Sequence, residues 1–172
     1  MIVIIVQRGT GLREGVINAD AETVWALLTD WGTMDWWGNE LQEAGMKVSR
    51  CFLEGIEGTV PRTKVIERAN SDDAGLPHTN RETLIHEDPI ARQLFYNGTD
   101  NFVEGVRNYI ATWAFDPLPD GKTKMHISSV FDVVEPGDVN AVRDIVEAVY
   151  EMIFKGINGY FASRNVTAET PA

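Results

Sequence analysis

Glu82 is the residue of this sequence whose type and predicted position best suit acid–base chemistry. It lies in the segment 81–86, where the apolar Leu84 is expected to face inward. Residues two apart on a strand share a face, so Glu82 and His86 are expected to point inward as well. A carboxylate in a mostly apolar hollow can serve as a general acid or base. The alternative for Glu82 is a structural ion pair with Arg62 or another arginine, and His86 is either part of a proton network or simply solvated.

Phenol and indole side chains form a second chemically useful group. Tyr109 and Tyr96 can donate hydrogen bonds to a carbonyl or stabilise an enolate, or they can be core residues with one satisfied hydroxyl. Alternation places Trp113 and Phe131 among the inward-facing aromatic residues of two later strands. Trp37, one of three closely spaced tryptophans, either walls the mouth of a pocket or packs a short helix against the sheet.

The charge balance and the scarcity of metal-binding side chains exclude several classes of partner. The chain has 15 lysines and arginines against 26 acidic residues, a formal net charge of −11. This balance repels nucleic-acid phosphates, so no nucleic-acid partner is expected. The single cysteine, Cys51, permits no internal disulfide, and the apolar start at 1–6 is too short for a membrane span, which together predict a cytoplasmic location. His78, His86 and His126 lack a metal-ligand spacing, so neither a metal nor another cofactor is expected.

Turn residues divide most of the chain into short predicted elements. A helix is predicted over 21–29 after the N-cap Asp20, and a second short helix or turn over 31–37. Six β segments follow, over 46–53, 59–67, 81–86, 92–97, 107–115 and 124–134. Connections this short favour antiparallel neighbours. The glycines of 9–15 resemble a dinucleotide-binding fingerprint, but strand residues follow them, so they are interpreted as a bend in an edge strand.

A long amphipathic helix is predicted over 138–163, with its apolar residues at steps of three and four. One helix of about 10 Å diameter cannot fill the concavity of a sheet that curls round it, so space for a small ligand is expected. Val149 and Ile153 would floor that space, although any core helix needs such residues. The predicted fold is therefore an α+β helix-grip, a curved antiparallel sheet of about seven strands around a long C-terminal helix, with two short N-terminal helices. A single domain over 1–172 is expected, with its core at about 13–163.

These residues resemble the START or Bet v 1-like (SRPBCC) superfamily, in particular its polyketide cyclase/dehydrase-like proteins, with local similarity to plant abscisic-acid receptors. The resemblance is carried, in order along the chain, by the segments 16–25, 58–62, 75–77, 82–84 and 106–113. Gly75, Leu76 and Pro77 resemble the receptors' gate loop, which closes over the ligand. The resemblance implies that Glu82 and Tyr109 are polar residues of a ligand cavity.

Two further ligand contacts are expected beside these. Asn108 precedes Tyr109 in the matching segment, and Arg62 follows Gly58 at a strand start, where it can neutralise an anionic group although Pro61 disturbs the register. The receptors' histidine-arginine-leucine latch is absent around 104–106, and no cavity lysine can be placed. A neutral or phenolic apolar ligand is therefore expected rather than abscisic acid.

Three functions remain open on these grounds. The first is a cofactor-independent cyclase, dehydratase or lyase acting on an aromatic or polyketide-like molecule, with Glu82 transferring a proton and Tyr109 holding the substrate oxygen. The second is a non-catalytic carrier or sensor of a small hydrophobic ligand. The third is a structural protein with a collapsed cavity. A homodimer is compatible with each of them.

Overall fold

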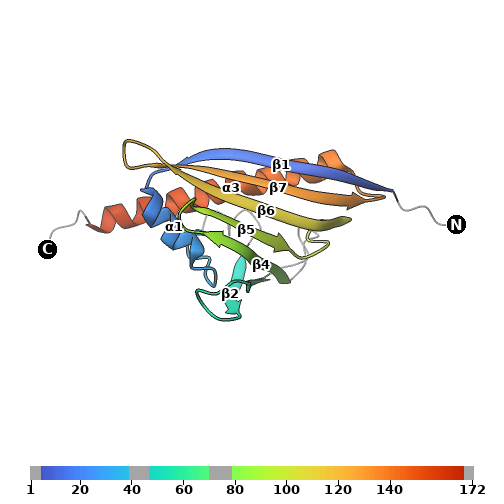
Figure 1. Cartoon of the computed structure of the whole chain (residues 1–172), viewed down its shortest axis with the longest axis horizontal. Helices are drawn as coiled ribbons and strands as arrows, with labels where there is room; N and C mark the ends of the chain where they lie inside the picture. Colours follow the sequence, from blue (N-terminus) through green and yellow to red (C-terminus); the bar gives the residue numbers. More distant parts are fainter. Residues whose placement is uncertain (1–4, 39–46, 70–78, 169–172) are drawn as a thin grey trace.

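The computed structural model describes residues 5–38, 47–69 and 79–168, which form one curved antiparallel sheet held against a long helix (Figure 1). The seven strands follow the spatial order β1-β7-β6-β5-β4-β3-β2. Their bounds are β1 (Val6–Ile17), β2 (Val48–Glu54), β3 (Arg62–Arg68), β4 (Thr79–Asp88), β5 (Gln93–Gly98), β6 (Val106–Pro117) and β7 (Thr123–Val134). The helices are α1 (Ala21–Thr29) and α3 (Val139–Ala168). The predicted helix-grip fold is confirmed.

Both helices begin at an aspartate that caps them. The Asp20 carboxylate accepts the Thr23 backbone N–H at 3.0 Å, and the Asp138 carboxylate accepts two N–H groups of the first turn of α3. The segment 31–37, predicted as a second short helix or turn, forms turns that bury Trp31 and Trp36. No helix in the described ranges is long and apolar enough to cross a membrane.

Glycines allow β1 to approach α3 closely. Gly9, Gly11 and Gly15 fall on the inner face of β1, and a Cβ atom on Gly15 would lie 2.7 Å from the Phe154 ring. β1 is the edge strand that was predicted here. It runs unbroken from Val6 to Ile17, and close packing against the helix accounts for its glycines, because the missing side chains admit α3. Since α3 lies against β1 at one edge, the rest of the inner face, toward β3 and β4, is left for other side chains to cover.

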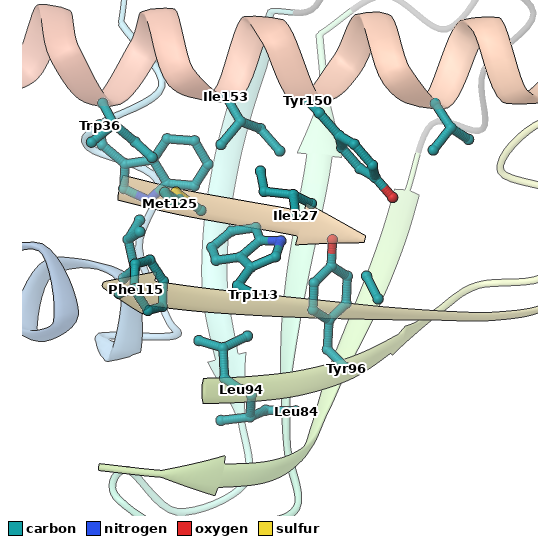
Figure 2. Close-up of a cluster of buried hydrophobic side chains, with 14 of the residues drawn as sticks. Trp36, Leu84, Leu94, Tyr96, Trp113, Phe115, Met125, Ile127, Tyr150 and Ile153 are labelled. Atoms are coloured by element: carbon teal, nitrogen blue, oxygen red, sulfur yellow. The ribbon is translucent and has the colours of Figure 1, made fainter. Parts of the chain in front are cut away.

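Burial alternates along the central strands as predicted. On β6 Tyr109, Ala111, Trp113 and Phe115 are buried, and on β7 Met125, Ile127, Ser129 and Phe131 are buried. These inner residues meet the apolar stripe of α3, and Figure 2 shows Tyr150 and Ile153 descending from the helix toward Trp113 and Ile127. Two register shifts interrupt the pattern, one in β4 after Leu84 and one in β6 after Arg107.

Candidate functional site

A cavity of about 110 Å³ lies between α3 and the inner face of β3, β4, β5 and β6. Most of its wall is apolar or aromatic and includes Trp36, Trp37, Ile66, Phe102, Val103, Val146, Val149 and Ile153. Its polar lining residues are Lys64, Arg68, Asn80, Glu82, Tyr96, Tyr109 and Tyr150. A few polar groups in a mostly apolar wall are typical of small-molecule sites.

A buried ion pair forms one wall of the cavity. Lys64 of β3 and Glu82 of β4 are direct cross-strand partners, and Nζ lies 2.9 Å from Oε2. The lysine side chain is 3% exposed and the glutamate side chain 17%. The ammonium lies 4.0 Å from the ring centroid of Trp31 and about 6 Å from those of Trp36 and Trp113. Carboxylate and aromatic faces together stabilise a cation that water cannot reach.

A chain of hydroxyl groups links the sheet to the helix at the cavity wall. Tyr150 of α3 donates to Ser129 Oγ at 2.6 Å, and the Tyr109 and Tyr150 hydroxyls are 2.8 Å apart. Since Tyr150 uses its proton on Ser129, Tyr109 donates to Tyr150. Burial raises the pKa of Tyr96, Tyr109 and Tyr150, the cavity tyrosines, well above the usual tyrosine range. These phenols therefore act as neutral hydrogen-bonding groups.

Two buried polar atoms at the cavity lack a well-formed hydrogen bond within the described ranges: the indole N–H of Trp113, whose neighbour is the Tyr96 hydroxyl, and the side-chain Oδ1 of Asn80. The Trp113 side chain is 2% exposed, and Figure 2 shows its N–H directed toward the side of the cavity where Tyr96 and Tyr150 lie. Leaving such a group unpaired costs about 1 to 3 kcal/mol. A ligand with a matching acceptor and donor would remove that penalty.

The structure brings together most of the predicted site residues that lie in the described ranges. Seven of them line the cavity: Trp37, Glu82, Tyr96, Tyr109, Trp113, Val149 and Ile153. Phe131 does not line it but stacks behind Tyr109, with ring centroids 6.3 Å apart and planes inclined by 22°. The predicted gate loop, Gly75 to Pro77, lies outside the described residues.

Arg62 is buried away from the cavity, contrary to its expected role as a ligand contact. Its guanidinium donates to the backbone oxygens of Thr59 and Thr29 at 2.7 and 2.9 Å, and it pairs with Glu87 at 2.8 Å. It ties α1 to the start of β3. The alternative expected for Glu82 was an ion pair with an arginine; Glu82 does form an ion pair, but its partner is Lys64.

The two register shifts remove His86 and Asn108 from the site. In β4 the step from Leu84 to His86 opposes a single step in β5, so His86 pairs with the outward-facing Phe95 and is exposed. Asn108 is the extra residue of the β6 shift, with a φ of 54°. It is exposed on the outer face and donates to Asp132 at 2.9 Å.

Sequence reasoning missed Lys64, Arg68, Asn80 and Tyr150. Period-two alternation along 62–68 would have placed both cations on one face, and the position of Tyr150 four residues after Val146 would have placed it on the apolar stripe of α3. The pairing of Lys64 with Glu82 could not be predicted from neighbouring residues, because more than ten residues of sequence separate the two positions.

Comparison with known proteins adds a family match. A family model described as polyketide cyclase/dehydrase and lipid transport matches residues 13–158. No match was found among curated proteins. Among solved structures, norcoclaurine synthase from Thalictrum flavum in complex with dopamine and hydroxybenzaldehyde is similar with a TM-score of 0.64 at 16% identity, covering 97% of this chain and 91% of that one. An uncharacterised protein from Bacillus thuringiensis gives a TM-score of 0.66 at 16% identity, with coverage of 90% and 99%.

Proposed function

Because this chain belongs to the polyketide cyclase/dehydrase and lipid transport family of the Bet v 1-like superfamily, we propose that it binds a small, ring-bearing, largely apolar molecule and catalyses a cofactor-independent cyclisation or dehydration on it. The buried Lys64–Glu82 ion pair in the cavity wall is the observation that carries this proposal. A charged pair that contributes only to stability is readily replaced by apolar residues, so its position against an open cavity favours a chemical role.

Cavity size and composition support the choice of ligand. A cavity of about 110 Å³ is similar in scale to an engineered apolar cavity of about 150 Å³ that binds benzene. Indole and phenol rings in the wall can contact a flat ring edge to face. The T. flavum enzyme was solved with two ring-bearing molecules, which is consistent with such a ligand in this fold.

Proton transfer by Glu82 is the proposed chemical step. The carboxylate would take a proton from a carbon next to a substrate carbonyl, and the electron pair would move to the carbonyl oxygen, where Trp113 N–H and Tyr109 can donate hydrogen bonds. The enolate carbon would then attack a second carbonyl of the same molecule, and the new alkoxide would recover the proton from Glu82. Removal of another α-hydrogen with loss of hydroxide releases water. Atoms and charge balance without an oxidant or a reductant.

A non-catalytic carrier is the second candidate, and one observation favours it. The Tyr109 proton is directed to Tyr150, and one oxygen of Glu82 is held by Lys64, so substrate binding would have to redirect these groups before either could act. A carrier needs no such rearrangement.

A thermal-shift screen with phenolics, polyketide fragments, sterols and fatty acids tests ligand binding, since a ligand that binds only the native state raises the melting temperature. Catalysis is then tested by following each stabilising compound by mass spectrometry with wild-type protein and with Glu82→Gln. The proposal predicts a product whose mass is unchanged or lower by one water. It also predicts that Glu82→Gln still binds but does not turn over. Binding without any product would favour the carrier, and no stabilisation by any compound would favour the structural alternative.

The cytoplasmic location, the lack of a nucleic-acid partner and the option of a homodimer remain predictions from sequence.

A further inference from the structure

Three cationic side chains lie along the inner face of β3, at positions 62, 64 and 68. The first two each have a carboxylate from β4: Arg62 pairs with Glu87 at 2.8 Å and Lys64 with Glu82 at 2.9 Å. The third, Arg68, makes no ion pair with any carboxylate in the described ranges, although it lines the cavity. The row therefore contains two neutralised charges and one that faces the cavity without a carboxylate.

The surroundings of Arg68 make this charge costly. Its side chain is half-buried, and burial lowers the pKa of the guanidinium, the direction expected when a cation leaves water without full compensation. Glu82 exerts a weaker attraction on it, but Lys64 already occupies one Glu82 oxygen. An arginine remains charged at neutral pH, so deprotonation does not relieve the free-energy cost of burying the Arg68 charge. An anion bound from outside the chain would relieve that cost.

We propose that Arg68 anchors a carboxylate group of the ligand, so that the cavity takes a ring-bearing carboxylic acid as its anion. This rests on the proposed binding function and narrows its ligand class. A guanidinium presents two parallel N–H donors that match the two oxygens of a carboxylate, whereas the charge of Lys64 is already paired with Glu82. The net charge of −11 repels anions at a distance, so affinity for one depends on a local cation such as this.

The spacing along β3 fits a ligand with two different ends. Arg68 and Lys64 are four residues apart on one face of the strand, which separates their Cα atoms by roughly 13 Å. Long side chains reach into the cavity from both positions. A carboxylate at Arg68 would leave the ring of a small acid among the aromatic side chains of the wall, next to Glu82 and Tyr109.

Cinnamate and cinnamamide are suitable probes, because they share ring and length and differ in charge. We expect calorimetry on the full chain to give a dissociation constant about tenfold to a hundredfold lower for cinnamate, the range of a hydrogen bond to a charged group. Arg68→Gln should remove this preference and leave cinnamamide binding unchanged. Arg50→Gln is the matched control, since Arg50 is an exposed cation on the neighbouring β2 that does not line the cavity. It should retain the preference. Acetate, an anion without a ring, should not bind.

The outcomes separate this inference from the proposed function. Equal binding of cinnamate and cinnamamide by the wild-type protein would overturn the Arg68 anchor and leave a ring-binding cavity intact. A preference for cinnamate that survives Arg68→Gln would also overturn it, because another group would then hold the anion. If neither probe binds and no compound of the wider screen stabilises the protein, both proposals fail. Thermal melting of each variant shows whether it is folded.

Discussion

Replacing Lys64 with methionine should destabilise the protein by about 3 to 4 kcal/mol. Methionine keeps the length of the lysine stem but leaves the Glu82 carboxylate without its partner at 2.9 Å. Breaking a buried pair costs about 3 to 5 kcal/mol, and the 17% exposure of Glu82 argues for the lower end because water reaches its oxygens. Loss of the cation lying 4.0 Å from the Trp31 ring adds about 1 kcal/mol. In a chain of 172 residues the melting temperature should fall by about 10 °C.

Urea unfolding followed by tryptophan fluorescence measures this change. Lys124→Met is a matched control, because Lys124 pairs with Glu14 at the same 2.9 Å but the two side chains are 40% and 47% exposed. It should cost less than about 1 kcal/mol. Lys64→Met combined with Glu82→Leu should restore most of the lost stability, since no unpaired charge then remains. If Lys64→Met costs no more than Lys124→Met, the argument that burial makes the Lys64–Glu82 pair costly to break is wrong.

Three other changes probe the remaining polar contacts. Tyr150→Phe should cost about 1 to 3 kcal/mol in urea unfolding, because the buried Tyr109 and Ser129 hydroxyls lose their shared partner; no change would mean that they find other partners. Burial raises the pKa of the cavity tyrosines above the unfolded value of about 10. The stability that these neutral phenols contribute is fully present below about pH 10 and should fall as pH rises past it, and the absorbance of their tyrosinate forms should appear only on unfolding. Hydrogen bonds from Asn108 and Arg8 lower the pKa of Asp132 in the folded protein. The stability that this carboxylate contributes is present above its unfolded pKa of about 4 and is lost as pH falls through its folded pKa. Asp132→Asn should therefore flatten the decline of stability at acid pH, and an unchanged decline would refute this role of Asp132.

Local patterns in the sequence were sufficient for the fold. Alternation along β6 and β7 and the stripe of α3 come from side chains close in the chain, so Tyr109, Trp113 and Val149 could be assigned to the inner side without knowing what they meet. The aspartate caps likewise depend on neighbouring residues, and they located the starts of both helices.

Contacts between residues on different strands could not be predicted from local sequence patterns. Lys64 and Glu82 meet because β3 and β4 pair in one particular register, and nothing in either segment specifies that register. A shift by one residue reverses every later side chain, which is why the extra residue near Leu84 turned His86 outward against expectation. Arg62 was misassigned for a similar reason: its partners are backbone oxygens of Thr29 and Thr59, and their approach is a property of the folded chain.

The inner-face glycines of β1, Gly9, Gly11 and Gly15, influence the size of the cavity without contacting its charged residues. A methyl group on Gly11 would lie 3.0 Å from Val146 and 3.4 Å from the Tyr150 ring, two residues that line the cavity. A single substitution at the outermost strand would therefore reposition the helical wall and its phenol while leaving Lys64, Arg68 and Glu82 untouched. Evolution or design can thus change the size of ligand that the cavity accepts through Gly11, a position remote from every group that would bind charge or transfer protons.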